Sequence, residues 1–261
     1  MPQHAELLPR YKHLRQVGLE LNNRLVKTLS KSTLEEGGKK LGIFKNNAIT
    51  LDTEDEISVL MDCCIHDLRR QGKNAIEHYL AESPPAADSD EMVLLQALRQ
   101  ARFSLFVVEA VEPGVGVHVR DLLRDEPLFL VDVGFSRSTP LGMILAARVM
   151  APEGIGMTTG AALPIGALPP GDRGRFLQDK VTRFKDADFR NLSPEEASEL
   201  ATTVIRNCLQ HGAAEHIKYV EPAPLANLHL TLLDRVGVRL DSFADSTGKI
   251  DTLFSPVGLA G

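Results

Sequence analysis

Acidic and histidine side chains in the first third of the chain have a spacing that could bind a metal ion. Asp62 and His66 are four residues apart in a predicted helix, so both could reach one ion from the same face. Cys63 would lie on another face, and His78, beside Glu77, could contribute from the next helix. A local Asp–His pair on a helix surface is the simpler interpretation. Asp62, His66 and His78 are therefore weak candidate ligands.

A second group of potential ligands lies near residue 210. Cys208 falls on the apolar stripe of a predicted helix, and Gly212 is expected to end that helix before His216. His211 and the other two residues therefore need not converge, and a buried structural cysteine is the simpler interpretation. Neither group has the paired CxxC or HExxH spacing of zinc sites. We predict no metal and no cofactor.

The segment GIGMTTG, residues 154–160, could present hydroxyls and backbone N–H groups to an anion. Thr158 and Thr159 supply the hydroxyls. The segment matches neither the GxxxxGK[ST] phosphate loop nor GxGxxG before a helix, and no GxSxG elbow occurs in the chain. A strand with threonines beside a glycine bend explains it more simply. A hydrolase-type enzyme with a site near His118, Asp132 and Thr159 stays open as an alternative.

Charged side chains interrupt the apolar strands that follow residue 103. Asp132 falls inside a predicted strand, where a charge must face solvent or be paired, and Arg120 or Arg148 could pair with it. A salt bridge specific to the fold is the simpler interpretation, and a polar pocket on the sheet is the alternative. The candidate binding residues are those with polar side chains in these strands: His118, Arg120, Asp121, Asp132, Arg148, Thr158 and Thr159.

A basic stretch, residues 173–185, could contact nucleic acid. Its Arg and Lys residues surround Phe176, Leu177, Val181 and Phe184, which form the apolar face of an ordinary amphipathic helix. The formal net charge of −6 and the 5% aromatic content do not favour an overall grip on nucleic acid or stacking of bases. Nucleic-acid binding is therefore a possible but not a favoured function.

Composition indicates a globular protein of one large or two modest domains. The 261 residues are 43% hydrophobic and 25% charged, which is close to average for folded proteins. Charges interrupt the first 30 residues, and no run of about 18 apolar residues occurs, so neither a signal peptide nor a membrane span is expected. Three cysteines, two of them adjacent, suggest a reduced, cytoplasmic chain. The leucine-rich N-terminal helix leaves a homo-oligomer open.

Apolar spacing predicts a helical N-terminal region over residues 1–102 that includes a short hairpin. A helix is expected from about 8 to 30, and a second helix should open at Ser32 and end near Gly42. Residues 43–52 resemble a hairpin that turns at two asparagines. Thr53 should cap the next helix, and two more helices should follow, the last capped by Asp88 or Ser89.

The residue pattern changes from helical to alternating at about residue 103. Five short β-type runs follow, and they start near 103, 115, 127, 142 and 155. Their spacing predicts an antiparallel β centre over residues 103–164, in the form of a small barrel or a strongly bent meander. The fold class is therefore α+β, with helices flanking the β centre.

Residues 165–261 are predicted to hold C-terminal helices and a tail packed on the same domain. A Pro- and Gly-rich linker covers 163–174. A later helix has a complete start signal, with Ser193 as the cap and Pro194 at its first position. Two β-like runs, LHLTLL and VGVRL, come next, and whether they join the central sheet is left open.

The stretch VEAVEPGVGVHVRDLLRDEPLFLVDVGFS, residues 108–136, with GMILAARVM after it, resembles the β-rich segment of bacterial proteins that carry the SEC-C motif. Residues 11–164 resemble uncharacterised bacterial proteins of similar layout. The cysteine-rich SEC-C zinc motif itself is missing here, so its zinc and its SecB-like or ribosome-related associations are not carried over. The resemblance implies a shared β unit and no activity.

These observations favour a non-enzymatic interaction or regulatory protein. A protein or peptide partner would bind the β centre and its loops EPGVG, residues 112–116, and SRSTP, residues 136–140. A hydrolase-type enzyme and a nucleic-acid-associated factor are the alternatives.

Overall fold

The structure, a computed structural model, describes residues 4–49, 54–167, 171, 173–184 and 187–211. The chain divides into two units, Met1–Ala214 and Glu215–Gly261. All described residues belong to the first unit. The two predicted C-terminal β-like runs, His216, Thr53 and Gly212 lie outside the described residues.

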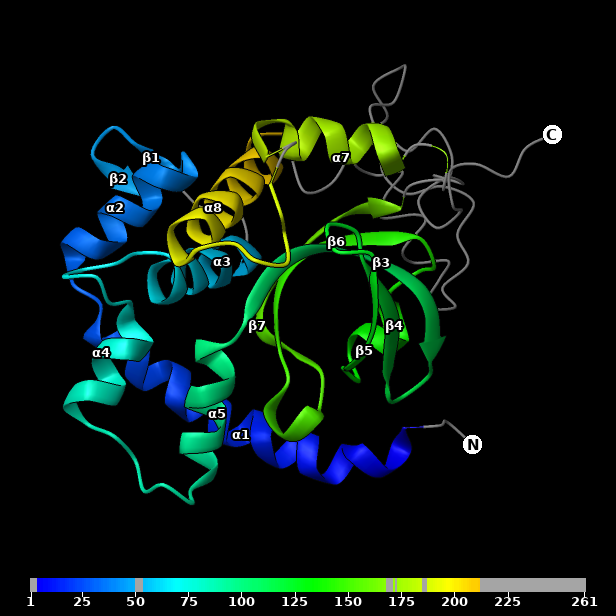
Figure 1. Ribbon diagram of the computed structural model, residues 1–261, viewed down its shortest axis with the longest axis horizontal. Coiled ribbons are helices and arrows are strands. Elements are labelled where there is room, and N and C mark those ends of the chain that lie inside the picture. The colour runs from blue at the N-terminus through cyan, green and yellow to red at the C-terminus, as the bar shows by residue number, and fades with distance from the viewer. Residues whose placement is uncertain (1–3, 50–53, 168–170, 172, 185–186, 212–261) are drawn as a thin grey trace, which may run out of the picture. The chain divides into compact units, whose positions relative to one another are not determined.

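The N-terminal third is helical, as the apolar spacing predicts. A single 3-10 turn, η1 (Ala5–Leu7), leads into α1 (Leu8–Thr28), and α1 buries Leu14, Leu21 and Leu25 completely. Along one side it packs on α4 (Ala75–Glu82) and α5 (Asp90–Arg99) (Figure 1). Ser89 caps α5 by accepting a hydrogen bond from the backbone N–H of Met92.

The second helix begins earlier than predicted. The cap of α2 (Lys31–Leu41) is Ser30, which accepts from the backbone N–H of Thr33, so the predicted cap at Ser32 is wrong. Gly42 ends the helix in the left-handed conformation, at φ 77°. The short strands β1 (Phe44–Lys45) and β2 (Ala48–Ile49) then form the predicted hairpin, since both asparagines of its turn have positive φ.

Five strands form one antiparallel sheet, which confirms the predicted β centre as part of an α+β fold. They are β3 (Arg102–Glu112), β4 (Gly116–Asp121), β5 (Glu126–Val131), β6 (Met143–Met150) and β7 (Met157–Ala167). Their order is β5-β4-β3-β6-β7, so the sheet is not a simple meander. After β5 the chain passes through the short helix α6 (Phe135–Ser138) and returns to pair with β3.

The sheet is strongly curled, and its two edges approach each other (Figure 1). Val131, at the end of β5, donates its N–H to the carbonyl of Gly156, just before β7, at 2.8 Å. Within the described residues, β5 and β7 are not paired as neighbouring strands of the sheet. The predicted bend is thus present, while a closed barrel is not found. The linker predicted from residue 163 also begins later, because β7 continues to Ala167.

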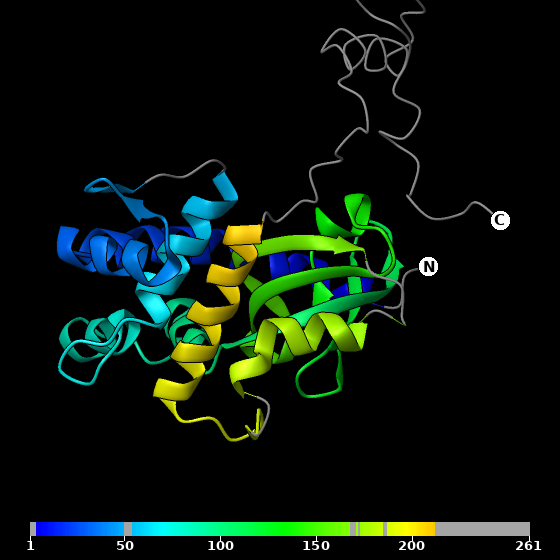
Figure 2. The same ribbon diagram turned by 90° about the horizontal axis from the view of Figure 1, so that it is seen from above.

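The two faces of the sheet have different partners. The inside of the curl is filled by its own side chains, among them Phe106, Val119 and Leu145. The outer face of the sheet packs against α3 (Glu54–His66) and α8 (Pro194–His211), and α2 in turn packs against these two helices. The helix α1 lies on the opposite side of the sheet from α8 (Figure 2). None of the described helices has the length and apolarity needed to cross a membrane.

The described part of the C-terminal region consists of α7 (Arg173–Val181), the 3-10 turn η4 (Thr182–Phe184), and α8. The start of α8 is as predicted: Ser193 accepts from the N–H of Glu196, and the Glu196 carboxylate accepts from the N–H of Ser193. Phe176, Leu177 and Val181 pack against the core. The basic segment is thus an amphipathic helix, as its spacing predicts.

Candidate functional site

A buried arginine with two carboxylates lies between α3 and the sheet. Arg148 on β6 is 5% exposed, and its Nε donates to Asp62 Oδ2 at 2.9 Å. Its second nitrogen, Nη2, donates to Asp67 Oδ2 at 2.6 Å. Thr159 on β7 donates its hydroxyl to the other oxygen of Asp62 at 2.7 Å. Asp62, Asp67, Arg148, Thr159 and the neighbouring His66 are called the buried ion group below.

Local structure explains why these residues meet. Asp62 and His66 are one helical turn apart on α3, and the His66 Nε2 lies 3.7 Å from Asp62 Oδ1. Asp67 follows the last residue of α3, where the chain turns away. On β6 the buried apolar residues and Arg148 alternate between the two faces, so Arg148 points outward toward α3.

One positive charge cannot neutralise two buried negative charges, and the pKa values reflect this. Burial raises the pKa of Asp67 to about 7, with a further increase from the charge of Asp62, although Arg148 acts against both. Burial alone would also raise the pKa of Asp62. For this carboxyl, however, the charge of Arg148 and the hydrogen bonds from Thr159 and Arg148 prevail, and its pKa is lowered. Near neutral pH Asp67 is therefore the carboxyl of this group that can gain or lose a proton.

The histidine of the group is neutral. Burial lowers the pKa of His66 to about 3, and the charge of Arg148 lowers it further, against the opposing effect of Asp62. The pKa of Arg148 itself is raised: burial opposes its charge, but Asp67 and Asp62 together outweigh that cost. The group therefore contains one permanent cation, one permanent anion, one neutral imidazole and one carboxyl that titrates near pH 7.

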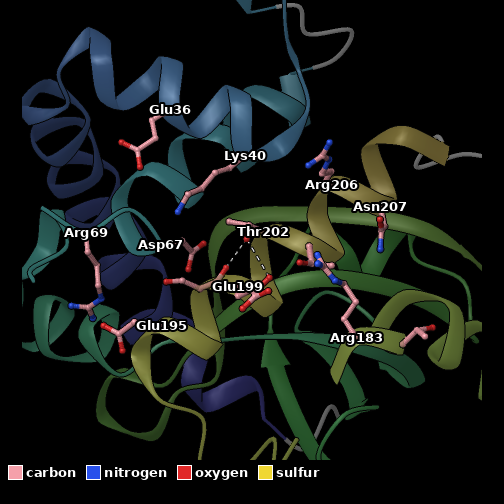
Figure 3. A pocket seen from close by; sticks show the side chains of 13 residues that line it. Glu36, Lys40, Asp67, Arg69, Arg183, Glu195, Glu199, Thr202, Arg206 and Asn207 are labelled. Carbon is pink, nitrogen blue, oxygen red and sulfur yellow. Dashed lines mark hydrogen bonds between the residues drawn. The ribbon is translucent and has the colours of Figure 1, made fainter. Parts of the chain in front are cut away.

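Asp67 also lines a polar cavity of about 760 Å³, called the polar cavity below. Its wall comes from α2, the residues that follow α3, η4 and α8 (Figure 3). Lys40 extends from α2 toward Asp67 in this view, and its charge slightly lowers the pKa of that carboxyl. The lining residues carry charges of both signs and several hydroxyls: Glu36, Lys40, Asp67, Arg69, Thr182, Arg183, Glu195, Ser198, Glu199, Thr202, Thr203, Arg206 and Asn207.

A glycine allows α2 to take this place in the wall. A Cβ atom on Gly37 would lie 2.5 Å from Cys64 Sγ and 3.2 Å from a methyl carbon of Leu60, both on α3. Only a residue without a side chain lets the two helices come this close. The close packing places Glu36, next to Gly37, and Lys40, three residues after it, beside the end of α3 where Asp67 lies.

Several of the residues that the sequence pointed to come together here. Arg148 and Thr159 were predicted as binding residues, and Asp62 and His66 as weak metal ligands; all four belong to the buried ion group. His78 does not: its Nε2 lies 3.0 Å from the carbonyl of Arg70. Asp67 was not predicted from the sequence, although its position just after His66, at the end of a helix, could have marked it as a candidate.

The remaining predicted binding residues have other partners. Arg120 binds Glu109 and Asp125, and His118 binds Glu112. Asp121 is buried and accepts from Ser104, from two backbone N–H groups and from Arg124. Thr158 is buried, and its carbonyl accepts from Arg15 at 3.2 Å.

The predicted pairing of Asp132 with Arg120 or Arg148 is wrong. Strand β5 ends at Val131, so Asp132 lies just beyond it, ahead of α6, where its carboxylate accepts from the N–H of Phe135 at 2.9 Å. His118, Asp132 and Thr159, the residues of the hydrolase alternative, thus have three separate sets of partners.

Comparison with known families places this geometry in a group without an assigned activity. Residues 5–170 match the model of DUF7986, a family of unknown function, and the chain belongs to that family. The match contains the whole buried ion group, while η4 and α8 lie beyond it. No curated protein and no solved structure matches the chain. Nothing in the family match links the chain to SEC-C-motif proteins, so that resemblance stays a prediction.

Proposed function

We propose that this member of the DUF7986 family is a non-enzymatic binding protein that holds a charged peptide segment of a protein partner in the polar cavity. The observation that carries the proposal is the cavity itself, whose volume of about 760 Å³ lies within the range of ligand sites in proteins. The predicted contact through the loops of the β centre, residues 112–116 and 136–140, would be a second and separate contact with the partner, since none of these residues lines the cavity.

The charges of the polar cavity favour a ligand with both an ammonium and a carboxylate group. Lys40, Arg69, Arg183 and Arg206 face four acidic residues across its wall. A polyanion such as nucleic acid would meet those acidic side chains and be repelled by them. A peptide with alternating charges could pair with both sets. Arg69 is already held by Glu77 at 2.9 Å, which leaves the other three cations as the main contacts for a carboxylate.

The floor of the polar cavity is already ordered, which favours binding. Asp67 is fixed by Arg148, and Arg148 is fixed by Asp62. Because these side chains lose little freedom when a ligand arrives, the entropic cost of binding falls mainly on the exposed residues of the wall. Ligand binding and the protonation of Asp67 should therefore be coupled, since a positive ligand group near Asp67 favours its ionised form.

Calorimetric titration with short peptides tests the proposal. The probes are hexapeptides with alternating Lys and Glu, with a poly-Glu and a poly-Lys hexapeptide and a single-stranded oligonucleotide for comparison. We expect the mixed-charge peptide to bind most tightly. Lys40→Glu should weaken it at least about tenfold, which is the effect of losing one charge pair of about 1.4 kcal/mol.

Lys12→Glu is the matched control, because it makes the same charge change on an exposed face of α1. Binding that is equal in the two variants, or a preference for the oligonucleotide, would contradict the proposal. Far-UV circular dichroism of both variants must first match that of the wild type.

One observation favours an enzyme as the second candidate. Asp67 has a pKa of about 7 and borders a polar cavity, as a general acid or base would. If the protein is an enzyme, Asp67→Asn would abolish turnover of a bound peptide and leave its affinity nearly unchanged. In a pure binding protein the same variant would change only the pH dependence of affinity.

A bacterial, cytoplasmic setting and a barrel-like β scaffold are also part of the proposal. The support for the compartment is that Cys63, Cys64 and Cys208 are all buried in the core and form no disulfide. The support for the scaffold is the hydrogen bond between the edges of the curled sheet.

A further inference from the structure

Two histidines and a glutamate meet at the β3–β4 hairpin, away from the polar cavity. Glu112 Oε1 lies 2.7 Å from His4 Nδ1 and 2.8 Å from His118 Nε2. Within the part of the chain that the structure describes, this is the only set of three or more His, Cys, Asp or Glu residues whose ligand atoms all lie within 4.8 Å of one another. Of these three residues, His118 was predicted from the sequence as a binding residue, Glu112 only as part of the loop of residues 112–116, and His4 not at all.

The hairpin register brings Glu112 and His118 to one face. Glu112 pairs with Gly116 and Ala110 pairs with His118, so Glu112 and His118 are diagonal neighbours across the turn. A bulge between Val108 and Ala110 sets this register. Val117 and Val119, which flank His118 in the strand, point to the buried inside of the sheet, so the cluster lies on the outer face.

Phe129 fixes the position of His4, the third residue of the cluster. Its ring stacks on that of His4 with 3.9 Å between centroids and 19° between planes, and it lies 4.7 Å from the ring of His118. Gly116 makes room for it, since a Cβ atom there would lie 2.9 Å from the Phe129 ring. The backbone N–H of His4 also donates to Glu112 Oε2 at 3.1 Å. All three side chains are therefore held in place before any ligand binds.

We propose that His4, Glu112 and His118 bind one divalent transition-metal ion, with Zn²⁺ as the best fit. Two imidazole nitrogens with one carboxylate oxygen form a ligand set that zinc accepts in proteins, whereas Mg²⁺ and Ca²⁺ prefer oxygen alone. The side chains are 25%, 12% and 37% exposed, in the order His4, Glu112, His118, so an ion can reach them from solvent.

The present geometry needs only a small change to hold an ion. Zinc bonds of about 2.0–2.2 Å place neighbouring ligand atoms roughly 3.3 Å apart in a tetrahedron. His4 and His118 now lie closer than this to Glu112 because each is hydrogen-bonded to it. The ion would lie between the ligand atoms, and each neutral imidazole would carry its proton on the ring nitrogen that does not face the ion. Each ligating nitrogen would move about half an ångström away from Glu112 Oε1, and the second oxygen of Glu112 would keep its bond to the His4 N–H. Water would complete the tetrahedron.

The same three side chains could instead form only a hydrogen-bonded clamp that ties the N-terminal segment to the sheet. The two functions differ in what each atom must do. A clamp needs hydrogen-bond capacity at residue 112, which glutamine retains. A metal site needs the negative charge of the carboxylate, which glutamine lacks.

Calorimetric titration of the full chain with ZnCl₂, after removal of metals with a chelator, tests the proposal. We expect one Zn²⁺ per chain in the wild type. His118→Ala and Glu112→Gln should each weaken binding by at least about 100-fold, because losing a ligand costs more than the 10–100-fold loss seen for supporting residues. Acidification should release the ion, since imidazole must be neutral to coordinate it.

His13→Ala is the matched control, because His13 also pairs with a carboxylate, Asp90, at 2.6 Å on the surface. Zinc affinity should not change in this variant. Zinc should also raise the melting temperature of the wild type and of His13→Ala, but not that of Glu112→Gln. No zinc binding by the wild type, or equal loss in all three variants, would overturn the proposal. So would full affinity in Glu112→Gln, which would leave the clamp as the explanation.

Discussion

Replacing Asp67 by asparagine should change how the stability of the protein depends on pH. Asparagine keeps the shape of the side chain and can still accept the hydrogen bond from Arg148 Nη2, but it cannot ionise. In the wild type, burial raises the pKa of Asp67 from its ordinary value of 3.8 to about 7. The folded chain therefore holds this proton through a pH range in which the unfolded chain has lost it.

The size and sign of the effect follow from that difference. A raised carboxyl pKa contributes stability that is fully present below about pH 4 and is lost as the pH rises to about 7. Each pKa unit corresponds to about 1.4 kcal/mol, so the full loss is about 4 kcal/mol. Relative to Asp67→Asn, the free energy of unfolding of the wild type should fall by about this amount over the interval and then become constant.

In the wild type, the titration of His66 offsets the effect of Asp67 on stability. Because burial lowers its pKa from 6.5 to about 3, the neutral imidazole contributes stability that grows as the pH rises between those values. The effects of Asp67 and His66 are similar in size and opposite in sign between about pH 4 and 6.5. Together, Asp67 and His66 should therefore make the stability of the wild type depend little on pH in this interval. The variant His66→Gln should lose stability as the pH rises.

Urea unfolding followed by circular dichroism, in steps from pH 4.5 to 8, measures the required free energies. Asp88→Asn, on the exposed loop before α5, is the control for removing a carboxylate and should run parallel to the wild type. A carbon-13 NMR titration of the carboxyl groups would locate the proton directly. If the difference between wild type and Asp67→Asn is the same at pH 4.5 and pH 8, the reasoning about the buried ion group is refuted.

Four further substitutions test the charge, packing and helix-capping arguments by the same unfolding assay. Arg148→Met should destabilise the protein by about 3–5 kcal/mol at pH 8, because two buried carboxylates lose their cation. The loss should be smaller at pH 5, where Asp67 is protonated. An equal loss at the two pH values would argue against this account. Gly37→Ala should cost about 1–3 kcal/mol through its clash with α3. By contrast, Gly18→Ala on α1, where the new carbon would meet only Leu94 at 3.8 Å, should stabilise the fold by up to about 1 kcal/mol, and the same sign for both would exclude the packing argument. Ser193→Ala should cost about 1 kcal/mol, and no loss would mean that the cap contributes little.

Local patterns were enough to predict most helices and all five strands of the sheet. The turn at Asn46 and Asn47 and the start of α8 at Ser193 depend on a few neighbouring residues, and both were predicted correctly. The cap of α2 failed because Ser30 and Ser32 are equally good caps by type, and only the actual helix start separates them. Asp132 was misassigned for a similar reason, since the strand ends one residue before it.

The buried ion group depends on contacts that no local pattern shows. Asp62 and Arg148 are 86 residues apart, and they meet because α3 covers the outer face of β6. Periodicity identifies that a helix has a buried face but not which strand will cover it. The sequence therefore pointed to Asp62, His66, Arg148 and Thr159 separately, for separate reasons, and it gave no basis for joining them or for adding Asp67.

Strand-to-strand pairing between molecules usually begins at the exposed edges of a sheet. In this protein the end of β5 and the start of β7 are joined by the hydrogen bond from Val131 to Gly156, so each edge shields part of the other. A Cβ atom on residue 156 would lie 2.2 Å from the carbonyl oxygen of Phe129, so any residue larger than glycine would force the edges apart. The backbone groups freed in this way could pair with a second chain. Gly156 thus lets the two edges of the sheet close on each other, so that fewer of their backbone groups are open to another chain.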